Sequence, residues 1–179
     1  VYIEITKKVI KSGKQAIVLV PEIALTSQIV KRFKAEFDSD VVVIHSKLSI
    51  SERNDVFTRI RTKDANIVIG ARSAVFAPVV DLGIIIMDEE HDFSYKQEES
   101  PKYNTVNVAQ QRLKLSNGLL LLGSATPALN TYFAALNKKI KLLKLSQRID
   151  NSVLPAVNLV DMRDELKKGR RKIISHDLH

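Results

Sequence analysis

Residues 83–91 constrain the fold more than any other part of the chain. They read Gly-Ile-Ile-Ile-Met-Asp-Glu-Glu-His. Four consecutive apolar residues without alternation are typical of a short strand that is buried on both faces, as in a parallel sheet covered by helices. Three carboxylates and a histidine follow directly, and open α/β sheets bind ligands at the carboxyl ends of their strands. The segment therefore predicts a central parallel strand with a polar site at its end.

The carboxylates of Asp88, Glu89 and Glu90 repel one another unless a cation or a reaction uses them. Mg²⁺ bound together with nucleotide phosphates needs only one or two carboxylates and keeps several waters. The pattern favours a Walker B site, in which Asp88 holds the Mg²⁺ shell and Glu89 orients or deprotonates the attacking water. The alternative interpretation is an acidic loop after a core strand, because four-residue motifs recur by chance.

Strand-like and helix-like apolar patterns alternate along the rest of the chain. This alternation predicts one α/β domain over residues 1–163, with a mainly parallel, doubly wound sheet flanked by helices. Besides the strand that ends at Met87, short strands are expected at residues 16–20, 41–44, 66–69, 119–122, 141–145 and 156–160.

Helix ends are predicted from capping residues. Gly13 suits the C-cap of a first helix. Ser49 and Glu52 form a capping box for a later one. Thr126 is expected to cap a helix that has Pro127 in its first position. Two helices should turn an apolar face inward: Leu25, Ile29, Phe33 and Phe37 in the earlier one, and Leu129, Tyr132, Phe133 and Leu136 in the later one.

Composition narrows the class of partner. The 179 residues carry a net charge of +8 and contain no cysteine, which excludes disulfides and cysteine-ligated zinc within them. A basic balance favours nucleic acid or another anionic surface. No apolar run approaches the ~20 residues of a membrane span, so the expected location is cytoplasmic, without a membrane partner. The chain opens on Val1 in place of Met, and we expect it to be an internal fragment.

Four strand ends carry polar segments that together resemble superfamily 2 helicases. Residues 88–91 resemble motif II and residues 124–126, Ser-Ala-Thr, resemble motif III. Residues 20–28 are similar to motif Ia, and residues 70–78 to motif Ib. The sequences of these four segments match a narrower pattern than that of the superfamily as a whole, and they resemble its replication-restart DNA helicases. Three further segments resemble the same helicases: residues 92–98, 123–129 and 154–163. The resemblance covers essentially the whole chain and implies a RecA-like, P-loop NTPase lobe.

The resemblance also implies roles for the motif residues. Glu89 would be the catalytic base for ATP hydrolysis, and Asp88 would bind Mg²⁺ through the nucleotide. His91, Ser124 and Thr126 would couple the state of the bound ATP to DNA. The plainer alternatives are a locally hydrogen-bonded loop histidine and helix-capping hydroxyls.

DNA contacts are implied at the strand ends and in the loop that follows motif II. The residues concerned are Pro21, Glu22, Gln28, Arg72, Ser73, Tyr95, Lys96 and Tyr103. A guanidinium just past a strand end suits a phosphate. Aromatic and basic side chains interleaved in one loop suit a single strand. Arg72 could equally be a surface arginine, and the two tyrosines could pack the loop onto the domain.

Two departures from the family pattern stand out. The family's glycine-rich phosphate-binding loop, ending in Gly-Lys-Thr, should lie immediately before Val1, and residues 11–14 lack the spacing that would replace it. The fragment alone is therefore expected to be inactive. Relatives usually carry Ala-Arg-Asp where Thr-Val-Asn stands at residues 105–107. The second lobe, a zinc region and a further DNA-binding domain would lie outside the chain, beyond a basic linker at residues 164–179.

The resulting hypothesis is the first motor lobe of an ATP-dependent 3′→5′ DNA helicase that restarts stalled replication forks. Its partners would be forked and single-stranded DNA, with primosome and single-strand-binding proteins in the full-length, nucleoid-associated protein. Two alternatives remain: a non-catalytic DNA-binding or assembly module with a degenerate ATPase fold, and another superfamily 2 repair helicase.

Overall fold

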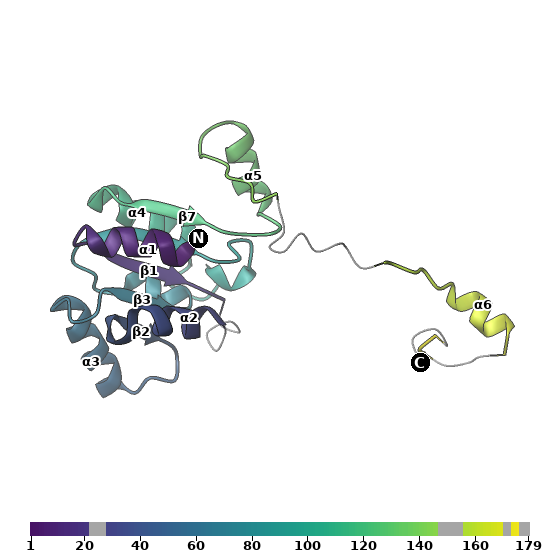
Figure 1. Cartoon of the computed structure of the whole chain (residues 1–179), viewed down its shortest axis with the longest axis horizontal. Helices are drawn as coiled ribbons and strands as arrows, with labels where there is room; N and C mark the ends of the chain where they lie inside the picture. The colour runs from purple at the N-terminus through teal and green to yellow at the C-terminus, as the bar shows by residue number, and fades with distance from the viewer. Residues whose placement is uncertain (22–27, 147–155, 170–172, 176–179) are drawn as a thin grey trace. The chain divides into compact units, whose positions relative to one another are not determined.

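The structure is a computed structural model that describes residues 1–21, 28–146, 156–169 and 173–175. The chain divides into two compact units, Val1–Ile140 and Lys141–His179 (Figure 1). Parts of the sequence predictions lie outside the described residues: Glu22, Leu25, the start of the segment 154–163 and the basic residues 170–172.

A five-stranded sheet forms the centre of the first unit. Its strands are β1 (Gln15–Leu19), β2 (Val41–Ile44), β3 (Ile67–Gly70), β4 (Leu82–Met87) and β7 (Leu119–Leu122), in the order β2-β3-β1-β4-β7. Every neighbouring pair is parallel. The predicted fold class is confirmed, and because all five strands are parallel their carboxyl ends share one edge of the sheet.

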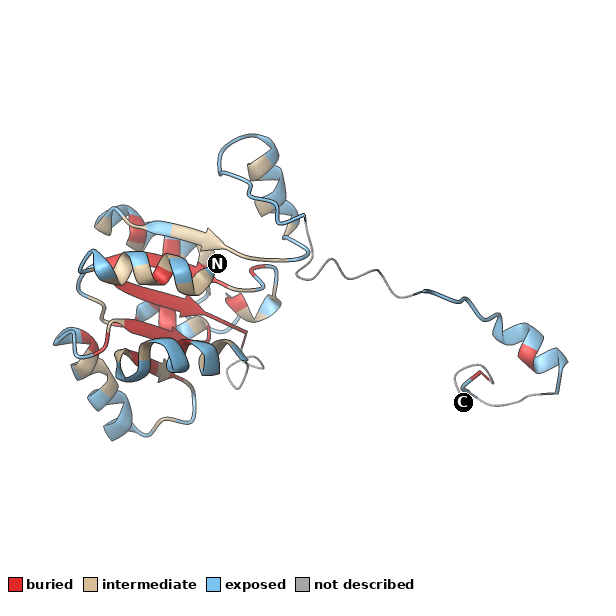
Figure 2. Cartoon of the chain, viewed as in Figure 1, coloured by how far each residue is buried: buried red, intermediate tan, exposed pale blue. Residues whose placement is uncertain are grey.

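Helices cover both faces of this sheet, and the alternation of side chains along each strand decides which face a residue serves. Ile84 and Ile86 pack in one core with residues of α1 (Tyr2–Lys11) and α2 (Gln28–Phe37). Ile85 and Met87 pack in the other core with residues of α3 (Ile50–Arg61) and α4 (Thr105–Ser116). The inner strands β1, β3 and β4 are buried throughout, as Figure 2 shows in red. Burial on both faces explains their unbroken apolar sequences.

Capping residues end the helices largely as their chemistry predicts. Ser49 and Glu52 form both hydrogen bonds of the capping box at α3. Gly13 follows α1 with a φ of +77°, a left-handed angle that glycine adopts without steric cost. Asn104 accepts hydrogen bonds from the first turn of α4, and Asn117 ends that helix in the left-handed region.

The helix α5 (Leu129–Leu136) departs from its prediction in two ways. It begins after Ala128, so neither Thr126 nor Pro127 has the expected capping position. Its apolar residues are not turned inward: Leu129, Tyr132, Phe133 and Leu136 are 81%, 36%, 65% and 60% exposed. Periodicity identifies the apolar face of a helix but not the surface that covers it.

Short elements lie between the helices and strands of the first unit. They are the 3₁₀ turns η2 (Asp38–Asp40), η3 (Arg72–Phe76) and η4 (Phe93–Tyr95), and a small antiparallel hairpin of β5 (Lys96–Gln97) and β6 (Tyr103–Asn104). The hairpin and η4 make up the loop after motif II.

The second unit holds one described helix, α6 (Met162–Lys167), whose start is capped by the Asp161 side chain. The strands expected at residues 141–145 and 156–160 are wrong, because the described residues there have no strand structure and are exposed. A strand requires a hydrogen-bonded neighbour, which an apolar pattern does not supply. Among the described residues of the chain, no helix is both long and apolar enough to cross a membrane.

Candidate nucleotide site and its neighbouring loops

The ends of β4 and β7 bring motif II and motif III together. Met87 and Leu122 are paired in the sheet, and the ladder continues beyond both strands. The Gly123 N–H donates to the Met87 carbonyl at 2.8 Å, and the Glu90 N–H donates to the Gly123 carbonyl at 3.0 Å. Residues 88–91 and 123–126 are therefore held side by side by backbone bonds.

Glu89 has a left-handed backbone, with a φ of 46°. This region is uncommon for residues other than glycine, asparagine and aspartate. Such conformations persist where the surroundings impose them, and they cluster at functional sites. The Glu89 side chain is 48% exposed, so its carboxylate is accessible at the edge of the sheet.

The His91 ring lies between the two motifs. Its Nδ1 is 2.7 Å from Ser124 Oγ, and its Nε2 is 3.4 Å from Thr126 Oγ1. Ser124 Oγ also accepts a hydrogen bond from the Thr126 N–H at 2.9 Å. The Glu89 carboxylate lies 3.6 Å from His91 Nδ1. The structure thus brings together the motif II and motif III residues that the sequence singled out.

Glu90 has a role that the sequence did not reveal. Its side chain is buried, and its carboxylate accepts hydrogen bonds from the Ala128 N–H at 2.7 Å and from Thr131 Oγ1 at 3.0 Å. A carboxylate here satisfies a free N–H at the start of α5 and suits the helix dipole. Glu90, in motif II, thereby fixes the start of the helix after motif III.

Two tyrosine hydroxyls hold Asp88. Tyr2 donates to Asp88 Oδ1 at 2.8 Å, and Tyr95 donates to the Asp88 backbone carbonyl at 2.7 Å. Burial, together with the hydrogen bond to Asp88, raises the pKa of Tyr2 well above its usual range. Burial, then the nearby charges of Asp88 and Asp92, raises the pKa of Tyr95 in the same direction. Both phenols therefore stay protonated and act as donors.

The donor set at this edge fits a cation that arrives with a nucleotide. Within the described residues, no group of three or more His, Cys, Asp or Glu side chains could hold a metal ion. Mg²⁺ bound to nucleotide phosphates takes one or two protein carboxylates. Asp88 and Glu89 supply that number at the carboxyl end of a central strand.

The loop after motif II exposes a different aromatic residue from those predicted. Tyr95 is only 2% exposed, and Tyr103 packs edge-on against Phe76 with ring centres 5.1 Å apart. Phe93 is 83% exposed, and the Lys96 ammonium lies 5.5 Å from the centre of its ring. In this structure the two tyrosines therefore pack the loop, while Phe93 and Lys96 face solvent.

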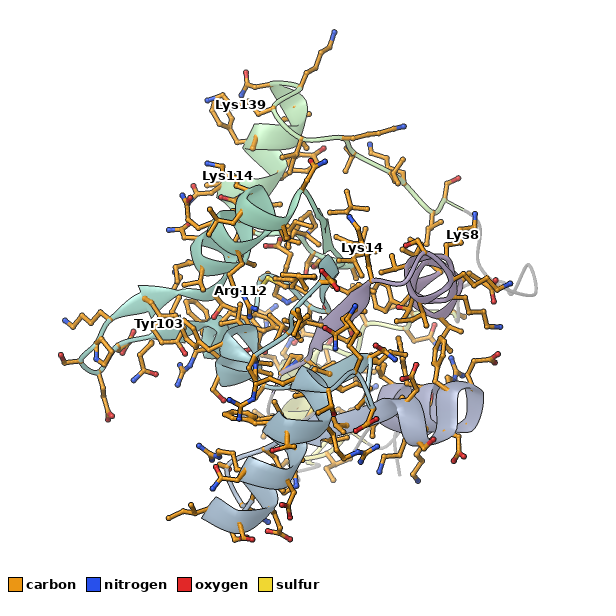
Figure 3. The ribbon with its side chains drawn as sticks, turned by 90° about the vertical axis from the view of Figure 1, so that its left-hand side faces the viewer. Lys8, Lys14, Tyr103, Arg112, Lys114 and Lys139 are labelled. Carbon is orange, nitrogen blue, oxygen red and sulfur yellow. The ribbon has the colours of Figure 1, made fainter. Side chains whose placement is uncertain are left out.

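Arg72 holds the loop through its backbone. One of its guanidinium nitrogens donates to the Lys96 carbonyl at 2.6 Å. Arg72 and Ser73 line a hollow of ≈ 230 Å³ with Gln97, Pro101 and Tyr103. Half-buried Arg112 of α4 donates to the Val75 carbonyl, so η3 is bound to α4 as well as to the hairpin. Figure 3 shows Tyr103 and Arg112 on these two neighbouring elements.

The structure describes only two of the three motif Ia residues that are predicted to contact DNA. Pro21 is buried two residues after the end of β1, and Gln28 is exposed at the first residue of α2. Tyr2 and Glu90 have the most informative of the roles that sequence reasoning missed. Tyr2 contacts Asp88 of motif II from the first helix, and Glu90 links motif II to the start of α5. In the sequence, the signal for a separate role of Glu90 was that it is the third of three consecutive acidic residues.

Comparisons with known proteins show which family the chain resembles. The family model described as DEAD/DEAH box helicase matches residues 1–133. The chain is 49% identical over 178 residues to the "Replication restart protein PriA" of Bacillus subtilis (strain 168), and 46% identical over 175 residues to that of Chlamydia muridarum (strain MoPn / Nigg). These matches cover 99% and 97% of this chain but only 22% and 23% of the two relatives.

A solved structure shares the fold. The C-terminal domain of the DEAD-box protein Dbp5 superposes with a TM-score of 0.50 at 12% identity, over 70% of this chain and 69% of that one. The family model covers well over half of the chain and includes both motifs of the site. The chain therefore belongs to the DEAD/DEAH box helicase family.

Proposed function

We propose that the chain is the first motor lobe of an ATP-dependent 3′→5′ DNA helicase that restarts stalled replication forks. The observation that carries this proposal is the His91 ring, whose Nδ1 lies near both Glu89 and Ser124 and whose Nε2 lies near Thr126. A motor needs such a connection, because hydrolysis at one site must change the shape of the part that holds DNA. The likeness to the PriA relatives supports the assignment to replication restart.

At the nucleotide site, Asp88 and Glu89 are the residues that would hold Mg²⁺ and ATP. Bound Mg²⁺ would neutralise the charge that develops on the phosphates. Glu89, with its accessible carboxylate, would orient the attacking water and accept its proton. Ser124, Thr126 and His91 would transmit the difference between the ATP-bound and ADP-bound states to α5 and the loops.

For DNA, the proposed contacts lie on the loops beside this site. Phe93 and Lys96 would meet a single strand directly, since both face solvent. Buried Tyr95 would act through its bond to the Asp88 carbonyl. Further contacts are proposed for Arg72, Ser73 and Tyr103 around the hollow, and for Pro21, Glu22 and Gln28 of motif Ia.

The wider assignment concerns the full-length protein, since the chain spans about a fifth of the length of its curated relatives. Residues 1–163 would form the lobe, followed by a basic linker to a second lobe. Phosphate binding, zinc binding and assembly with primosome and single-strand-binding proteins would involve residues beyond these 179. The protein would work in the cytoplasm, at the nucleoid. The 179 residues alone would not hydrolyse ATP, as they contain no G-x-x-x-x-G-K-[ST] sequence.

The deciding experiment is ATP hydrolysis by the full-length protein with and without DNA. Glu89→Gln preserves shape but removes the base, so turnover should fall by at least ~10²-fold while ATP binding survives. Glu98→Gln, on the exposed tip of the hairpin, is the matched control and should keep normal turnover. Near-normal turnover by Glu89→Gln would contradict the proposed role. A wild-type protein that binds DNA without hydrolysing ATP would favour the non-catalytic module.

A further inference from the structure

Tyr2 lies where α1 meets the ends of β4 and β7. It is the first residue of α1, and its ring packs with the apolar core on that face of the sheet. Its hydroxyl reaches Asp88 Oδ1 at 2.8 Å, across 86 positions of sequence. The sequence motifs of the site do not include this residue, yet it contacts the carboxylate on which the site is built.

Gly123 provides a second, independent observation of the same contact. A Cβ atom added at Gly123 would lie 1.7 Å from the Tyr2 hydroxyl oxygen and 2.9 Å from the ring carbon that bears it. The Gly123 N–H is bonded to the Met87 carbonyl, so this backbone is fixed at the end of β7. The phenol therefore occupies the space that any side chain at position 123 would fill.

A single donor on one carboxylate oxygen has a defined physical effect. It restricts rotation of the Asp88 carboxylate while leaving the second oxygen free to take another partner. Groups that orient the ligands of a metal in this way typically account for about 10–100-fold in metal affinity or activity. In this contact Tyr2 is the donor, because an ionised carboxylate can only accept.

We propose that Tyr2 is a positioning residue that orients Asp88 for nucleotide-bound Mg²⁺, and that Gly123 lacks a side chain to admit its hydroxyl. The proposal rests on the proposed function, since it concerns the same nucleotide site. Tyr2 acts through Asp88 and does not itself contact the phosphates or the metal.

The first test measures Mg²⁺-dependent binding of a fluorescent, non-hydrolysable ATP analogue to the full-length protein by anisotropy. Tyr2→Phe keeps the ring and removes the donor. It should raise the Mg²⁺ concentration for half-maximal binding by about tenfold, with an unchanged melting temperature. Tyr132→Phe removes a hydroxyl from α5 and serves as the matched control, with wild-type Mg²⁺ dependence expected.

A double-mutant cycle then separates positioning from general packing. Gly123→Ala displaces the phenol and should shift the Mg²⁺ dependence in the same direction as Tyr2→Phe. The double variant should show little further shift, because residues that act through one contact are not additive. Additive shifts would overturn the proposal. So would a Tyr2→Phe variant that binds as wild type, or one whose only change is a lower melting temperature. A wild-type protein that binds no nucleotide would instead contradict the proposed function.

Discussion

Glu89 shows how one residue can hold strain at a site. Its left-handed backbone, with a φ of 46°, costs a side-chain-bearing residue about 1 kcal/mol. The turn is imposed by neighbouring bonds: the Asp92 N–H donates to the Glu89 carbonyl at 2.8 Å, and the Glu90 N–H is bonded to Gly123. Glycine would adopt this angle at a lower cost, yet the chain has Glu89 here, with an accessible carboxylate. This supports a role for the carboxylate in the chemistry of the site.

This strain can be measured by comparing two substitutions that both remove the carboxylate. Glu89→Gly should be more stable than Glu89→Ala by about 1 kcal/mol, because only the alanine keeps the steric cost of the left-handed angle. Thermal melting of both variants of the full-length protein checks the ranking. The same pair at Glu98, which does not have a positive φ, should show no advantage for glycine. Alanine equal to glycine at position 89 would argue that the turn is not strained.

Among the elements, α5 depends on the site for its starting point. Its N-terminus is capped by a side chain from motif II, through the bonds of Glu90 to Ala128 and Thr131. The sequence around residues 124–128 offers hydroxyls and a proline at which a helix could begin, so local signals favoured Thr126. The contact across 38 positions decided otherwise, as tertiary bonds regularly override local preferences. The helix is thereby coupled to the residue that follows Glu89.

Glu90→Ala should therefore loosen α5. Removing a buried carboxylate leaves the Ala128 N–H and the Thr131 hydroxyl without their acceptor, at a cost of about 1–3 kcal/mol. Amide hydrogen exchange in residues 129–136 should accelerate, and the melting temperature should fall. Thr131→Ala loses only one of the two bonds and should have the smaller effect. Exchange in α5 that matches the wild-type protein would show that Glu90 does not fix the helix.

At the scale of the whole molecule, the features that follow from periodic sequence patterns were predicted, and the single contacts between distant residues were not. Buried strands such as β4 follow from an apolar run, and parallel pairing follows from the alternation with helices. The grouping of Asp88, His91 and Ser124 follows in turn, because parallel strands end at one edge. The contacts of Tyr2 with Asp88 and of Arg72 with the Lys96 carbonyl could not be predicted. Each of these contacts is a single hydrogen bond between residues far apart in the sequence, and such a bond leaves no periodic pattern from which it could be predicted.

In the loop after motif II, a solvent-exposed residue and a residue bonded to the nucleotide site are only two positions apart. Phe93 is 83% exposed, while Tyr95, two positions later, is buried and bonded to the Asp88 carbonyl. The Thr105 hydroxyl donates to the Tyr95 carbonyl at 2.7 Å and so ties the same residue to the start of α4. A strand stacked on Phe93 would therefore act on a segment that is anchored at Asp88 and at α4.

Phe93→Ala in the full-length protein should weaken binding of single-stranded DNA and reduce DNA-stimulated ATP hydrolysis, with basal hydrolysis unchanged. Stacking of one base on an aromatic ring contributes about 1–3 kcal/mol, which corresponds to a loss of affinity of at least about fivefold. The melting temperature should stay the same, because an exposed ring contributes little to packing. Ile50→Ala, which truncates an exposed apolar side chain on α3, is the matched control. Tyr95→Phe keeps the ring but removes the bond to Asp88, so it should lower the stimulation ratio while DNA affinity is retained. DNA affinity and stimulation that are unchanged in Phe93→Ala would show that this loop does not sense DNA.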